Sequence, residues 1–362
     1  MHGHGPLWHP RPRLNIASGG RFASVASRLT LVLITVLALT GCSETNPEWA
    51  TAPTPGQTSA SATTTPPPSP STALESCHGF PADNVWWADV SRLPVHQSSA
   101  AFIASIGASN GLHPDFGAGQ WEGAPIGIPV TTIPSAQAGV KVSFEYSRES
   151  DPGVYPIPAD ARVEGGRQST GDRHIILHDP AGCRVYELYA AYPAADGSWR
   201  AGSGAIFDLR SNKLRPAGWT SADAAGLSIF AGLIRYEEVA GGHIDHAIRI
   251  TVPRTRNAYV WPARHAASQL TDPALPPMGL RLRLKSDVDT SRFPAQARII
   301  ADAMKKYGVI IADNGSAWYV SGAPDDRWSN DALRVLKQLR GNNFEAVDSS
   351  SLMAGADSAA VR

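Results

Sequence analysis

Apolar and polar residues alternate along several segments in the middle of the chain. The alternation recurs in three segments: 140–146, 246–252 and 280–285. A period of two residues places successive side chains on opposite faces of a strand, so these segments predict β-strands. Two further β-type runs, 173–178 and 184–192, flank a loop that contains Pro180 and Gly182. This pair predicts a hairpin.

Helical patterns occur near both ends of the same region, over 98–106, 294–307 and 330–339. The second is the clearest helix of the chain, because Pro294 suits a first turn and two lysines before Gly308 complement the helix dipole. Two short strands, 309–312 and 318–321, follow it. The balance predicts an α+β fold, a β-rich antiparallel sandwich or jelly-roll-like body with flanking helices, the clearest of them near the C-terminus.

The N-terminal segment has the pattern of an export signal. Four arginines precede the apolar run Leu29–Leu39, which is too short to span a bilayer as a helix, and Leu39-Thr40-Gly41-Cys42 follows. This pattern resembles the signal peptide and lipobox of bacterial lipoproteins. The resemblance implies cleavage before Cys42, acylation of Cys42 by a diacylglycerol, and a lipid-anchored protein that faces the extracellular or periplasmic side of the membrane. An ordinary secretory signal with a cysteine at its cleavage site is the alternative.

Composition divides the rest of the chain. Residues 42–75 are rich in Pro, Ser and Thr and predict a disordered tether after the signal peptide of residues 1–41. Residues 76–349 predict a single globular domain, and 350–362 a disordered tail. The 32 Lys+Arg balance 32 Asp+Glu, so the chain lacks the basic excess that nucleic-acid binding requires.

Three cysteines occur, and Cys42 is assigned to lipid. Cys77 and Cys183 remain in a chain bound for an oxidising compartment, where a disulfide is the simplest interpretation. A catalytic or metal-binding cysteine is the alternative, but neither residue has CxxC spacing or a local nucleophile signature. The sequence predicts no cofactor.

Histidines and carboxylates concentrate between residues 172 and 265. On an extended strand His174 and His178 share one face and Arg173 projects to the other, and Glu187 lies opposite the histidines if the hairpin register permits. We interpret Arg173, His174 and His178 as candidate residues for positioning an acidic sugar. Surface or hydrogen-bonded structural histidines are the competing interpretation.

A second cluster, 235–249, contains Glu237, Glu238 and His246 beside a Gly-Gly link. These groups can donate and accept protons near neutral pH, and we interpret them as candidate catalytic residues. A polar connection between strands is the alternative. His243 and His246 lack the spacing of a zinc-protease motif, so the sequence predicts no metal site there.

Aromatic residues beside Gly- and Pro-rich segments, above all Trp219 and Trp261, suit stacking on sugar rings, although most tryptophans simply pack in cores. Four segments resemble those of an uncharacterised family of exported bacterial proteins: 244–249, 260–265, 278–285 and 312–319. That resemblance spans roughly residues 76–349 and brings no catalytic residues with it.

The leading functional hypothesis is an enzyme, a glycoside hydrolase or polysaccharide lyase, acting on cell-envelope or environmental polysaccharide. The alternative is a non-catalytic lipoprotein that binds a glycan or a protein. A third interpretation, a metal-dependent hydrolase, requires His174, His178 and His246 to meet at ligand distance.

Overall fold

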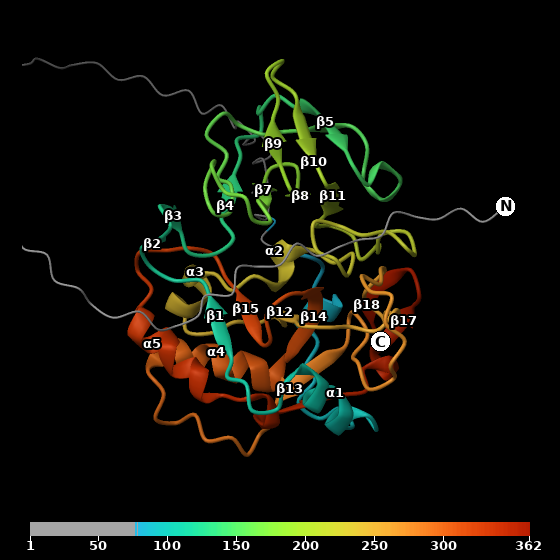
Figure 1. Cartoon of the computed structure of the whole chain (residues 1–362), viewed down its shortest axis with the longest axis vertical. Coiled ribbons are helices and arrows are strands. Elements are labelled where there is room, and N and C mark those ends of the chain that lie inside the picture. Colours follow the sequence, from blue (N-terminus) through green and yellow to red (C-terminus); the bar gives the residue numbers. More distant parts are fainter. Residues whose placement is uncertain (1–76, 78) are drawn as a thin grey trace, which may run out of the picture. The chain divides into compact units, whose positions relative to one another are not determined.

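The computed structural model describes Cys77 and residues 79–362 (Figure 1). The predicted signal peptide and the whole of the predicted tether, Cys42 included, lie outside this part. No helix in the described part is long and apolar enough to cross a membrane.

The larger core surrounds a six-stranded mixed sheet. Its strands, in spatial order, are β1 (His113–Asp115), β15 (Tyr319–Ser321), β12 (Ile248–Val252), β14 (Val309–Asn314), β13 (Arg281–Leu284) and β16 (Phe344–Ala346). The pairs β1–β15 and β12–β14 are parallel and the other pairs are antiparallel. Helices α1 (Ser99–Ile106), α4 (Ala295–Lys306) and α5 (Asn330–Val335) pack against this sheet. β12 and β14 are almost wholly buried, which explains their content of isoleucine and valine.

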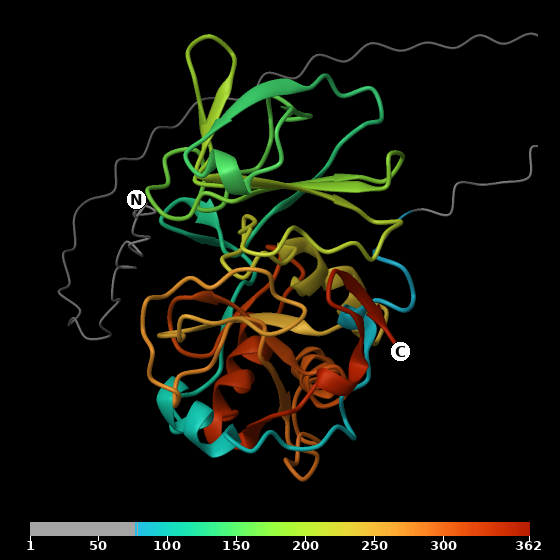
Figure 2. The same ribbon diagram turned by 90° about the vertical axis from the view of Figure 1, so that its right-hand side faces the viewer.

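Two four-stranded sheets form a second layered unit. One contains β11 (Ser203–Asp208), β8 (Arg184–Tyr189), β7 (Ile175–Asp179) and β4 (Val130–Thr132); the other contains β6 (Val154–Tyr155), β5 (Val140–Phe144), β10 (Trp199–Ala201) and β9 (Tyr192–Pro193). Their shared core includes Tyr155, Ile175 and Leu188. Figure 2 shows these green strands grouped apart from the orange and red elements of the six-stranded sheet.

The reverse face of the β7–β8 hairpin packs on the short helix α2 (Ile229–Gly232) through Ile176, Val185 and Phe230. Shorter elements complete the described chain: β2 (Gln120–Trp121), β3 (Ala124–Pro125), α3 (Tyr236–Ala240), β17 (Met353–Gly355), β18 (Ser358–Val361), and 3₁₀ turns at Val85–Trp87, Ser147–Glu149, Leu336–Gln338, Gly341–Asn343 and Ser350–Leu352.

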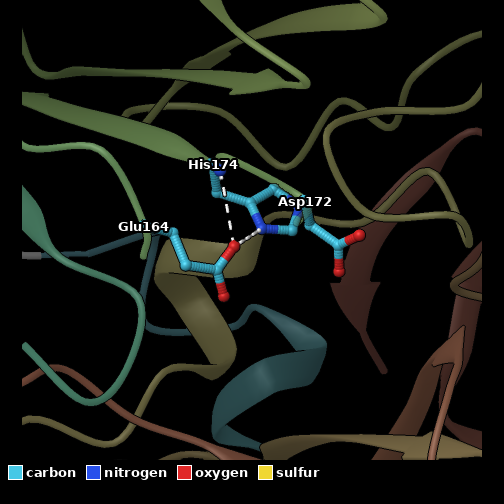
Figure 3. Close-up of side chains that lie close together, drawn as sticks. All are labelled: Glu164, Asp172 and His174. Atoms are coloured by element: carbon cyan, nitrogen blue, oxygen red, sulfur yellow. Dashed lines mark hydrogen bonds and ion pairs between the residues drawn. The ribbon is translucent and has the colours of Figure 1, made fainter. Parts of the chain in front are cut away.

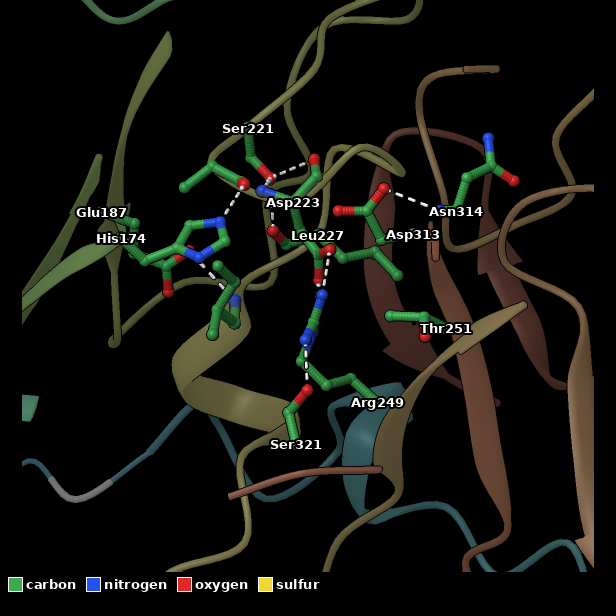
Figure 4. Close-up of polar contacts among 12 residues, drawn as sticks. His174, Glu187, Ser221, Asp223, Leu227, Arg249, Thr251, Asp313, Asn314 and Ser321 are labelled. Atoms are coloured by element: carbon green, nitrogen blue, oxygen red, sulfur yellow. Dashed lines mark hydrogen bonds and ion pairs between the residues drawn. The ribbon is translucent and has the colours of Figure 1, made fainter. Parts of the chain in front are cut away.

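A buried polar network lies between α2 and the six-stranded sheet (Figure 4). Arg249 on β12 donates two hydrogen bonds to the carboxylate of Asp223, at 2.9 and 2.7 Å, and a third to the Ser321 hydroxyl. Asp223 and Arg249 are both buried, so each charge depends on the other for the solvation that water would provide. This ion pair ties the loop before α2 to β12.

The structure confirms the β-rich α+β class, the β7–β8 hairpin, the helix at 295–306 and the Cys77–Cys183 disulfide. Two expectations need correction. The largest sheet is mixed and not purely antiparallel, because β14 follows β12 only after a long connection that contains β13 and α4. Residues 353–361 form the β17–β18 hairpin, whereas the sequence predicts a disordered tail there. The hairpin is held by long-range contacts such as the Val361 N–H to the Asp83 carbonyl.

Candidate functional site

A pocket of about 870 Å³ brings together residues from several separate parts of the chain. Its lining comes from the N-terminal segment that contains Phe80 and Trp87, from β4 and β7, from the segment 235–246, and from residues 323–325. The sequence-predicted residues His178, Glu237, Glu238 and His246 all line it. The two predicted clusters therefore meet in one pocket, although only part of the first cluster contributes.

Glu238 lies in the first turn of α3, where its carboxylate has three donors. Oε2 accepts a hydrogen bond from the Arg235 backbone N–H at 3.0 Å, and Oε1 contacts the Arg235 guanidinium and lies 3.1 Å from His246 Nε2. Burial works to raise its pKa, but the bond to His246 and the charges of His246 and Arg235 outweigh burial and lower the pKa of Glu238 to about 2. Glu238 is therefore a carboxylate at neutral pH.

His246 is buried immediately before β12. Its Nδ1 lies 2.7 Å from the carbonyl oxygen of Ala247, and its Nε2 faces Glu238. Each ring nitrogen of His246 therefore faces one oxygen atom. The indole of Trp87 meets the His246 ring edge-on, with 5.9 Å between centroids.

His178 and Glu237 occupy other parts of the pocket wall. His178 Nε2 lies 2.8 Å from the Cys77 carbonyl oxygen, and its ring lies against Phe230 with 4.9 Å between centroids. Glu237, with a largely exposed side chain, forms an ion pair with Arg327. The disulfide thus holds the peptide carbonyl that positions His178.

The aromatic walls of the pocket are Phe80, Trp87, Phe230 and Tyr236. The sequence-predicted Trp219 and Trp261 are not among its lining residues. Trp261 packs against the larger core and donates from Nε1 to the Ser358 carbonyl at 2.8 Å, and the Arg215 guanidinium lies over the Trp219 ring at 5.6 Å. The sequence did not predict Trp87 as a site residue because Trp87 lies far along the chain from Glu238 and His246.

Arg173 and His174 lie outside the lining of this pocket. Arg173 has a φ of +51°, and β7 begins only at Ile175, so His174 does not continue the strand face that carries His178. The buried Arg173 guanidinium donates to the carbonyl oxygens of Gly166, Arg167, Ser169 and Ala191. Its role in this structure is to hold the loop that precedes it.

His174 forms a second histidine–carboxylate pair (Figure 3). Its Nδ1 lies 2.6 Å from Glu164 Oε2, and its Nε2 lies 3.1 Å from the Ala222 carbonyl oxygen. Burial works to lower the pKa of His174, but Glu164 outweighs it and raises the pKa to about 9. Asp172 lies beside the pair. Nothing in the spacing of the sequence marks Glu164 as a partner of His174 and Asp172.

Glu187 pairs across the hairpin with Ile176, so it shares the strand face of His178 as the favourable register requires. It is wholly buried and accepts hydrogen bonds from the Ser228 hydroxyl and the backbone N–H groups of Ile229 and Phe230. Burial outweighs these bonds and raises the pKa of Glu187 to about 7. Glu187 caps α2 from inside the core.

No protein-family model, curated protein or solved structure matches this chain. The geometry of the pocket and of the Glu164–His174 pair is therefore the basis for assigning a function.

Proposed function

We propose that the pocket binds a carbohydrate, and that the protein is a lipoprotein, anchored through Cys42, that holds cell-envelope or environmental polysaccharide outside the cytoplasm. One observation carries the proposal: aromatic side chains and hydrogen-bonding groups share a single pocket of about 870 Å³. That volume lies within the ~300–1,000 Å³ typical of ligand sites.

Sugar rings suit such a lining because their C–H faces are apolar and their edges carry hydroxyl groups. Trp87 and Tyr236 offer flat faces, while His178 and Thr132 offer polar atoms. Arg162 also lines the pocket, and its exposed guanidinium has no ion-pair partner among the described residues. It can bind the carboxylate of an acidic sugar.

Binding without catalysis is favoured because the predicted acid–base groups already have partners. Glu237 pairs with Arg327, and Glu238 pairs with both Arg235 and His246. A general acid or base must instead reach the proton of a bound substrate.

Acid–base catalysis by a hydrolase or lyase is the second candidate. It is supported by the 3.1 Å contact between His246 and Glu238 at the pocket wall. If a substrate displaces this contact, the imidazole and the carboxylate become free to exchange a proton with it.

The test is calorimetric titration of the full chain with neutral and uronic-acid-containing oligosaccharides. We expect saturable binding, weakened about tenfold or more in Trp87→Ala through loss of ring stacking. Trp219→Ala is the matched control, because it removes an indole outside the pocket lining, and it should bind as the parent does.

The same oligosaccharides, incubated with the protein, separate the two candidates. Release of reducing ends or unsaturated sugars that is lost in both Glu238→Gln and His246→Ala would establish catalysis. Absence of binding to every glycan, or equal affinity of the Trp87 and Trp219 variants, would refute the carbohydrate site.

A further inference from the structure

The loop from Glu164 to His174 gathers three groups that can bind a metal ion. One ring nitrogen of His174 and one carboxylate oxygen each of Glu164 and Asp172 lie within 4.8 Å of one another. Imidazole nitrogen and carboxylate oxygen are ligands that Zn²⁺ takes in proteins, whereas Mg²⁺ and Ca²⁺ prefer oxygen alone. We propose that Glu164, Asp172 and His174 form a Zn²⁺ site, distinct from the carbohydrate pocket.

The orientation of His174 supports this site. Its Nε2 faces the Ala222 carbonyl oxygen at 3.1 Å, so Nδ1 is the nitrogen directed at Glu164. Metal-binding histidines commonly donate their second N–H to a backbone carbonyl, which fixes the ring and directs the other nitrogen at the ion. In the metal-free arrangement a proton bridges Nδ1 and Glu164. On binding, that proton passes to solvent and the Nδ1 lone pair bonds to Zn²⁺.

The distances require only side-chain adjustment. Ligand bonds of ~2.1 Å in a tetrahedral site separate the ligand atoms by about 3.4 Å. The 2.6 Å contact between His174 and Glu164 must therefore open, and the most distant pair, at most 4.8 Å apart, must close. Three protein ligands leave the fourth position to water or a substrate, and the Glu164 side chain is 25% exposed.

Charge balance also favours a cation. Two carboxylates surround one imidazole, and Zn²⁺ with a neutral imidazole would make the set neutral.

The loop is built to hold these ligands in place. Arg173 donates to three carbonyl groups between Glu164 and Asp172, and the Glu164 N–H donates to the His174 carbonyl at 3.0 Å. Gly165 has a φ of +69°, a conformation that a side chain would strain. Ligands on a loop with so many internal bonds lose little entropy when the ion binds.

Calorimetric titration of the chelator-stripped full chain with ZnCl₂ tests the site. We expect one Zn²⁺ per chain, and a loss of affinity of about a hundredfold or more in Asp172→Asn and in His174→Ala, because each removes a direct ligand. His96→Ala is the matched control, since it removes a histidine outside the loop, and it should bind Zn²⁺ unchanged.

A spectroscopic measurement tests the ligand geometry. Co²⁺ in place of Zn²⁺ should give the visible absorption of a four-coordinate nitrogen–oxygen site, absent in Asp172→Asn. If the buried His174→Ala change prevents folding, the half-exposed Asp172 position still decides the question. No saturable Zn²⁺ binding by the parent, or unchanged affinity in Asp172→Asn, would overturn the proposal.

Discussion

The pocket wall and the loop 164–174 each pair a histidine with a glutamate, but they balance charge in opposite ways. At the pocket wall, the single carboxylate of Glu238 contacts both Arg235 and His246. In the loop, the single imidazole of His174 lies among the carboxylates of Glu164 and Asp172.

The pKa values follow this difference in partners. Burial works to raise the pKa of Glu238, but His246 and Arg235 outweigh it and lower that pKa to about 2. Burial works to lower the pKa of His174, but Glu164 outweighs it and raises that pKa to about 9. A histidine–glutamate contact alone therefore does not define a function. The third residue beside each pair, Arg235 in the pocket wall and Asp172 in the loop, distinguishes their surroundings.

The largest expected effect comes from breaking the ion pair on which both regions depend. Asp223 follows Ala222, the acceptor of His174, and its partner Arg249 lies on β12, which begins just after His246. Asp223→Ala leaves a buried arginine unpaired and should lower the free energy of unfolding by about 3–5 kcal/mol. Urea denaturation measures this.

The control for that change is Asp302→Ala, which removes an exposed carboxylate from α4. It should alter the free energy of unfolding by less than about 0.5 kcal/mol. A loss at Asp223 no larger than the loss at Asp302 would contradict the role of the buried pair.

Removing the disulfide should weaken ligand binding in the pocket but not in the loop 164–174. Cys77→Ser with Cys183→Ser opens a link between residues 106 positions apart and should cost about 2–4 kcal/mol of stability. It also frees the Cys77 carbonyl that positions His178, so oligosaccharide affinity should fall while Zn²⁺ affinity is retained. Calorimetry with both ligands checks this, and equal losses for the two would show that the regions are not independent.

Arg173→Lys should have the opposite effect, because it should weaken Zn²⁺ binding and leave oligosaccharide binding unchanged. Lysine keeps the charge but lacks the planar fork that reaches several carbonyls, so the loop loosens around its ligands. We expect Zn²⁺ affinity to fall by about ten- to a hundredfold, as when supporting residues of metal sites are changed, with oligosaccharide affinity unaffected. Unchanged Zn²⁺ affinity would mean that the loop is positioned by its other contacts.

The smallest effect concerns pH. Because the folded pKa of Glu238 is about 2 and its ordinary value is 4.5, its contribution to stability is present above pH 4.5 and is lost as the pH falls towards 2. Glu238→Gln lacks this contribution. The difference in melting temperature between parent and variant should therefore become smaller as the pH falls from 4.5 towards 2. Glu237→Gln, at an exposed pair, is the control, and an identical narrowing there would contradict the assignment.

Local pattern was sufficient for much of the fold. Period-two alternation located strands such as β5 and β13, the Pro180–Gly182 loop located the hairpin, and the lysines before Gly308 located the end of α4. These features depend on neighbouring residues, which interact whatever the remainder of the chain does.

The site was predictable only in part. Glu238 and His246 are eight positions apart and their pairing could be anticipated from clustering. Trp87 reaches the same pocket from a distant segment, and the sequence contains no local sign of it. The positive φ of Arg173 likewise interrupts the strand face on which His174 and His178 were expected to lie together.

By itself, then, the sequence determined the β-rich class, the pairing of Cys77 with Cys183 and the concentration of histidine and carboxylate residues in one stretch. Only the tertiary structure decided which of these residues line the pocket and which form contacts within the loop 164–174. The reason is physical: strand and helix signals arise from neighbouring residues, whereas the partner that sets a charge, such as Glu164 for His174 or Arg249 for Asp223, is brought into contact by folding.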